Sequence, residues 1–121
     1  MLTKDELEAG LAQCTGSEQY HRHWLKLLKY TDGVYWLAEN AGAHWLIDAI
    51  ASHQPDAAKN PRLREFQLWR LSVRADHTAR LECLEDTDLV RITQEIEYTD
   101  FPLTEIKLYV TDGVLLLPSE N

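Results

Sequence analysis

Hydrophobic residues recur with two different periods along the chain. Between residues 34 and 51 they return about every 3.6 positions, which is typical of a helix that buries one face. Between residues 66 and 110 they alternate with polar residues, which is typical of antiparallel strands that bury one face. The period changes near residue 60. We therefore predict helices in the N-terminal part of the chain and a sheet in the C-terminal part.

Local signals mark where the helices begin and end. Thr3 and Glu6 fit a capping box, in which each side chain accepts a hydrogen bond from a free backbone N–H of the other residue. Thr31 fits the N-cap of a second helix, and Gly42 divides the pattern after it into two helices or one bent helix. Residues 18–29 fit a strand, an extended arm or a helix, because the segment is aromatic but also rich in leucine.

The apolar face of the sheet must be buried by other elements, and the helices can bury it. These elements therefore predict a two-layer α+β fold. In this fold, N-terminal helices pack on a C-terminal antiparallel meander sheet of about five strands. We expect residues 1–121 to form a single domain. Its helical part covers about 1–53, a loop covers 54–63, and its sheet part covers about 66–117. The loop is predicted from two prolines, an asparagine and an aspartate.

The string Thr-Asp-Gly-Val occurs twice, at Thr31–Val34 and at Thr111–Val114. The first copy precedes a helical pattern, so we predict that it caps a helix. The second copy places Asp-Gly between two apolar runs, which is the strongest local signal for a hairpin with a type I′ turn. The hydrophobic residues around the two copies recur with different periods. We therefore interpret the string as a local backbone signal that occurs twice, and not as an internal repeat.

Charge and composition narrow the class of protein. The formal net charge of −8 disfavours nucleic-acid binding, which needs an excess of lysine and arginine. No apolar run approaches the ~18 residues of a membrane span, and the N-terminus lacks an apolar signal core. We therefore expect a cytoplasmic protein without membrane contact. Cys14 and Cys83 are expected to be buried, reduced thiols.

The charges are unevenly distributed over the predicted strands. Residues 59–80 are mainly basic, and residues 82–105 are mainly acidic. On neighbouring antiparallel strands, opposite charges can pair across the solvent face. We favour this pairing over a patch that binds a partner.

Four segments together resemble a family of small uncharacterised bacterial proteins that carry a domain of unknown function. They are YTDGVYWLAENAGAHWLIDAI at 30–50, FQLWRL at 66–71, YTDFPL at 98–103 and LLLPSEN at 115–121. The resemblance covers most of the chain from residue 15 onward. It implies no activity, and it assigns no catalytic or binding residue.

One candidate for enzymatic chemistry lies in the second helical region. His44 and Asp48 are four residues apart and can touch on a helix, and Glu39 comes shortly before them. A carboxylate that orients a histidine is used in general acid–base catalysis. A small hydrolase-like enzyme built on these residues would need a cavity where they converge. An ordinary pair of residues at the edge of the core is the simpler interpretation.

His21 and His23 provide a weak candidate metal site, because residues two apart share a face of a strand. The regular ligand spacing of a zinc site is missing, so we expect two surface histidines and no cofactor.

Tyr35, Trp36 and Trp45 lie off the apolar stripe of the helical region. Either the chain encloses these aromatic residues itself, or they bind a partner, since aromatic residues are enriched at interfaces. We therefore favour a non-enzymatic protein-interaction module that binds a protein partner or associates with itself as a homodimer.

Overall fold

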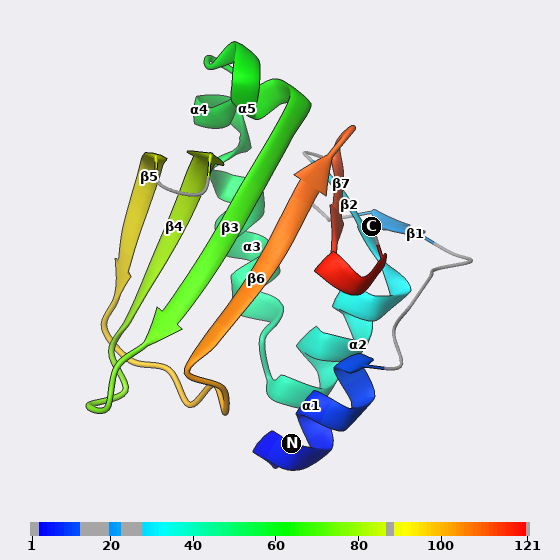
Figure 1. The fold of residues 1–121 in the computed structure, drawn as a ribbon, viewed down its shortest axis with the longest axis vertical. Coiled ribbons are helices and arrows are strands. Elements are labelled where there is room, and N and C mark those ends of the chain that lie inside the picture. The colour runs from blue at the N-terminus through cyan, green and yellow to red at the C-terminus, as the bar shows by residue number, and fades with distance from the viewer. Residues whose placement is uncertain (1–2, 13–19, 23–27, 87–88, 121) are drawn as a thin grey trace.

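The computed structural model describes residues 3–12, 20–22, 28–86 and 89–120. The helical elements are α1 (Lys4–Ala12), α2 (Asp32–Ala41), α3 (His44–Ser52), α4 (Gln54–Ala57), α5 (Pro61–Glu65) and the 3-10 helix η1 (Pro118–Glu120). The strands are β1 (Tyr20–Arg22), β2 (Lys29–Thr31), β3 (Phe66–Val73), β4 (Ala79–Asp86), β5 (Leu89–Ile96), β6 (Glu105–Thr111) and β7 (Val114–Leu116). Figure 1 shows their arrangement.

The predicted α+β class is confirmed, with a sheet that is mostly antiparallel. The described strands form one seven-stranded sheet in the order β1-β2-β7-β6-β3-β4-β5. Five of these strands come from the C-terminal part, as predicted. Their order differs from a simple meander, because β6 pairs with β3 and not with β5. The N-terminal part adds β1 and β2, and β2 pairs with β7 in parallel.

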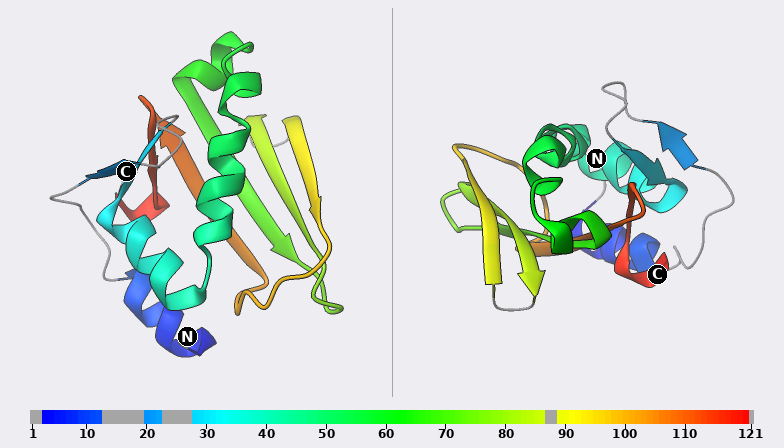
Figure 2. Two further views of the ribbon diagram at one scale, coloured as in Figure 1. Left: turned by 180° about the vertical axis from the view of Figure 1, so that it is seen from behind. Right: turned by 90° about the horizontal axis from the view of Figure 1, so that it is seen from above.

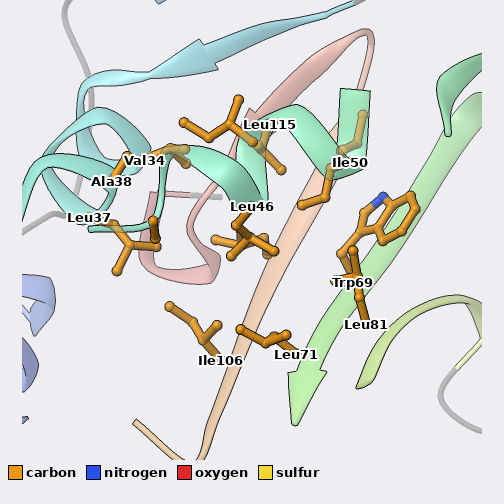
Figure 3. Close-up of a cluster of buried hydrophobic side chains, with 14 of the residues drawn as sticks. Val34, Leu37, Ala38, Leu46, Ile50, Trp69, Leu71, Leu81, Ile106 and Leu115 are labelled. Carbon is orange, nitrogen blue, oxygen red and sulfur yellow. The ribbon is translucent and has the colours of Figure 1, made fainter. Parts of the chain in front are cut away.

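Helices α3, α4 and α5 lie behind one face of the sheet, as the view from behind in Figure 2 shows. The core fills the space between these two layers. Figure 3 shows Leu46 and Ile50 of α3 facing side chains from the strands, including Trp69 and Leu71. The indole N–H of Trp69 donates to Gln67 Oε1 at 2.8 Å, so the largest core side chain keeps a partner for its polar atom.

The predicted helix caps are present. Thr3 N–H donates to Glu6 Oε1 at 3.4 Å, and Glu6 N–H donates to Thr3 Oγ1 at 3.3 Å. Thr31 Oγ1 accepts from the N–H of Val34 at 3.3 Å and caps α2. Gly42 ends α2 with a φ of 62°, so the helical region consists of two helices.

The prediction of a loop at residues 54–63 was wrong, because this segment contains α4 and most of α5. Pro55 and Pro61 occupy the first turn of each short helix, where the missing backbone N–H costs nothing. The side chain of Asn60 accepts from the N–H of Arg62 at 2.9 Å and caps α5. The residues that indicated a loop are therefore helix-start residues.

The uneven charges pair across neighbouring strands, as expected. Arg70 Nη2 lies 3.0 Å from Glu82 Oε1 between β3 and β4. Arg80 Nε lies 2.7 Å from Glu95 Oε2 between β4 and β5, and Arg74 Nη2 lies 2.9 Å from Glu95 Oε1. The hydrogen bonds from Arg80 and Arg74 hold the pKa of Glu95 below its usual value. These side chains thus stabilise each other on the sheet surface.

Cys83 is a buried free thiol, as predicted, and burial raises its pKa to about 12. Cys14 lies outside the described residues. No described helix has the length and the apolar character needed to cross a bilayer.

Candidate functional site

Aromatic rings and carboxylates gather where β1 and β2 meet the start of α2. The ring of His21 stacks on Tyr35, with ring centroids 4.6 Å apart, and on Tyr30, with centroids 5.3 Å apart. His21 Nε2 lies 2.8 Å from Asp32 Oδ1. These contacts attach β1 to the first turn of α2. His21 thus has a structural partner, whereas its candidate co-ligand His23 lies outside the described residues.

The cluster continues to α3 through Tyr35. The Tyr35 ring meets His44 edge-on at 6.1 Å, and His44 Nε2 lies 2.7 Å from Glu39 Oε1. The pKa of Tyr30 is raised by burial and then by Tyr35, Asp48 and Glu39, in that order. Sequence spacing therefore identified residues that lie in one region, and the hydrogen bond of His44 goes to Glu39.

Glu39 and His44 lie at the exposed surface of the described structure. The side chains of Glu39 and His44 are each 51% exposed. The described cavities, of about 540, 310, 440 and 470 Å³, have other residues in their walls. Both side chains of this pair are open to solvent. Within the described part of the chain, no group of three or more His, Cys, Asp or Glu could hold a metal ion.

The two candidate tryptophans pack on the chain itself. The ring of Trp36 lies so close to Gly10 of α1 that a Cβ atom at that position would overlap it. Trp45 is half-buried and packs against the core. Tyr35 is exposed, although its ring already contacts two histidines. Of the three proposed binding residues, Tyr35 is therefore the most available to a partner.

A second apolar surface lies on the side of the sheet away from α3. Figures 1 and 2 show no described helix in front of β3, β4 and β5 on this side. Five residues, one from each of five neighbouring strands, are aligned in register across it, and we call them the open-face row. They are Val90, Leu84, Leu68, Tyr109 and Leu116.

The open-face row forms a cluster of its own. Leu84 and Leu116 are buried, yet neither belongs to the core between sheet and helices. Phe66 lies two residues before Leu68 on β3, and its ring meets Tyr109 edge-on, with ring centroids 5.0 Å apart. It extends the row along β3. Phe66 remains 38% exposed and Val90 37% exposed. The row thus combines packed leucines with apolar groups that still face water.

Sequence analysis did not select this surface, although a signal was present. Leu68, Leu84 and Tyr109 occur at positions of the strand pattern that otherwise hold polar residues. Each one alone is unremarkable, because isolated apolar residues are common on protein surfaces. Only the strand order and register bring them into one line.

The C-terminal segment contacts the N-terminal end of α2. Glu120 Oε1 accepts from Thr31 Oγ1 at 2.6 Å and from the N–H of Leu117 at 3.0 Å. A Cβ atom on Gly33 would lie only 2.6 Å from Glu120 Oε1, so glycine leaves room for the carboxylate. Two conspicuous segments of the sequence, 30–50 and 115–121, therefore meet for a structural reason.

The family model of DUF6876, a family of unknown function, matches residues 5–121. The chain belongs to this family. The match covers both segments that meet at Glu120, and the expected membership of a family of unknown function is confirmed. No curated protein and no solved structure matches the chain. The DUF6876 family carries no assigned activity, so a function must be argued from the surfaces described above.

Proposed function

We propose that this DUF6876 protein is a non-enzymatic protein-interaction module, and that the open-face row is the centre of its binding surface. The observation that carries the proposal is the alignment of apolar side chains across five strands on a face that no described helix covers. Contiguous apolar surface on a folded domain typically marks an interaction site. Phe66 and Val90 provide the exposed apolar groups that a partner would bury.

This proposal moves the binding surface away from α2 and α3. Trp36 and Trp45 are half-buried against their own chain, which leaves less of their surface for a partner. Tyr35 lies among Asp32, Glu39 and other charged groups that are costly to remove from water. The open-face row itself contains no charged side chain, and the charged residues beside it already pair with each other, as Arg70–Glu82 and Arg80–Glu95.

A hydrolase-like enzyme is the second candidate, because His44 forms a hydrogen bond with a carboxylate, that of Glu39. The two candidates differ in the residues that they require. The interaction module needs the open-face row and tolerates the loss of His44. The enzyme needs His44, Glu39 and Asp48 and tolerates changes on the open face.

The test is capture of partners from native lysate by immobilised protein, with quantitative mass spectrometry. Four forms are compared: the wild type, Val90→Glu on the open face, His44→Ala, and Tyr98→Glu as a matched control. Tyr98 is 69% exposed and lies outside the row. Thermal melting of each variant checks that it is folded.

We expect one or more proteins to bind the wild type, His44→Ala and Tyr98→Glu equally, and to be lost with Val90→Glu. Capture that survives Val90→Glu and a second substitution, Phe66→Glu, would overturn the proposed surface. Capture lost with His44→Ala alone would instead support the second candidate.

A further inference from the structure

We infer that the open-face row binds a second copy of this chain in a symmetric dimer, with the two sheets packed face to face. The inference rests on the proposed function, because it names the partner of the same surface. It is carried by the charge of the open face, by the symmetry of the row and by the size of the surface.

The part of the open face where the strand register is regular carries no net charge, although the chain as a whole is strongly acidic. Six charged residues of β3, β4, β5 and β6 share this part of the face with the row, three basic and three acidic. They are Arg70, Arg80, Lys107, Glu82, Glu95 and Glu105. All six pair with one another, as Arg70–Glu82, Arg80–Glu95 and Lys107–Glu105. None of the formal charge of −8 therefore resides among them.

This distribution favours a second copy over a basic partner. Two copies that each carry a formal net charge of −8 repel each other in most relative orientations. The repulsion is smallest where the neutral parts of their surfaces meet. A basic partner would instead be drawn to the helical side, where Asp32, Glu39 and Asp48 lie. Electrostatic repulsion between two copies is therefore smallest for a contact through the open face.

The row is also suited to a twofold contact. Leu68 lies at its centre, with Leu84 and Val90 on one side and Tyr109 and Leu116 on the other. A twofold axis parallel to β3 at Leu68 places Leu68 against its own copy. The same axis places Tyr109 opposite Leu84 of the other copy, so a large ring faces a smaller aliphatic group. Symmetric dimers use such self-complementary patches.

The face is large enough for this role. Strands about 4.8 Å apart and about 3.3 Å long per residue give five strands a projected area on the order of 500 Å². A standard interface buries about 800 Å² of accessible surface on each partner, and accessible surface exceeds projected area because side chains protrude.

The experiment is sedimentation equilibrium with light scattering on the purified full chain over a range of concentrations. We expect the mass to approach twice the 14.0 kDa of one chain. Phe66→Lys and Val90→Lys place like charges on the twofold contact, and each should weaken the dimer at least about tenfold. Tyr98→Lys, at an exposed aromatic position away from the row, should leave the dissociation constant unchanged. Phe66→Ser and Val90→Ser serve as milder variants should a lysine variant fail to fold.

Salt gives an independent readout. Because the contact is apolar and the two copies carry like net charge, added salt should leave the dimer intact or tighten it. A wild type that is monomeric at every concentration would overturn the inference, as would a dimer that both open-face variants leave unchanged. A monomer that still loses a captured protein with Val90→Glu would refute the dimer and leave the proposed function standing.

Discussion

The two copies of Thr-Asp-Gly-Val fold into different structures. In the first copy, Thr31 caps α2 and Gly33 lies in its first turn. In the second copy, Asp112 and Gly113 have φ angles of 52° and 74° and form the two-residue turn between β6 and β7. The same four residues thus begin a helix in one place and form a turn between two strands in the other.

The difference shows that each residue of the string performs a different task in each place. Thr31 Oγ1 is buried, accepts from the N–H of Val34 and donates to Glu120. Thr111 Oγ1 makes one long contact of 3.4 Å to the carbonyl of Glu65. Gly33 leaves space for a carboxylate, whereas Gly113 has no other atom near its missing side chain and serves the turn through its positive φ. Substitutions at matched positions therefore test the comparison directly.

The largest difference is expected between the two threonines. Thr31→Ala should lower the free energy of unfolding by about 2–3 kcal/mol, because it removes an N-cap and one of the hydrogen bonds that the carboxylate of Glu120 accepts. Thr111→Ala should change it by less than about 0.5 kcal/mol, since the site is near the surface. Urea denaturation of both variants measures the difference. Thr31→Ser, which keeps the hydroxyl, should recover most of the loss, and equal losses at the two sites would contradict the comparison.

A smaller but more specific effect is expected at Gly33. Gly33→Ala should cost about 1–2 kcal/mol, because its Cβ displaces the Glu120 carboxylate from two hydrogen bonds, which outweighs the gain in helix propensity. In the Glu120→Ala background the same substitution should stabilise the protein by about 0.5–1 kcal/mol, since alanine favours the helix. The four proteins form a double-mutant cycle measured by denaturation. Additive effects would show that Gly33 and Glu120 act independently.

At Gly113 we expect a loss of about 1 kcal/mol on substitution by alanine, because an L-residue is strained at a φ of 74°. A steric clash does not contribute, since nothing lies within 4 Å of the added Cβ. Gly113→Asn should lose less than Gly113→Ala, because asparagine tolerates the left-handed region better. Thermal melting of both variants checks this order, and the opposite order would disprove the conformational explanation.

The smallest effects are expected at the two aspartates. Asp32→Asn should cost about 0.5 kcal/mol, because a negative charge in the first turn interacts favourably with the helix dipole. This loss should shrink at high salt, where the interaction is screened. Asp112→Asn should be close to neutral, since Asn-Gly suits the same type I′ turn. Denaturation at two salt concentrations compares the two variants, and a salt-independent loss at Asp32 would argue against the dipole effect.

Sequence patterns predicted the elements that depend on nearby residues. The capping box of Thr3 and Glu6 and the cap at Thr31 are confirmed, as is the hairpin at Asp112–Gly113. In each case the interacting groups lie within three residues of one another. The loop prediction at 54–63 failed because proline both breaks a helix and begins one, and the two uses look alike without the backbone around them.

The candidate sites were predicted less completely. Helical spacing placed Glu39, His44 and Asp48 in one region, since they are few residues apart. The stacking of His21 on Tyr35 was not predicted, because it requires β1 to pair with β2. The enclosure of Trp36 depends on α1, which packs against α2 from the other end of the helical part.

The sequence by itself determined the helical caps, the Asp-Gly turn at Asp112–Gly113 and the face that most strands bury, because these follow from short-range geometry and from the period of the side chains. Only the tertiary structure decided that β7 lies between β2 and β6, that Glu120 reaches Thr31 across 89 residues, and that five apolar side chains align on the open face. These arrangements depend on which distant segments lower the free energy most when they pack together. The favoured packing depends on the whole chain, so no local sequence pattern predicts it.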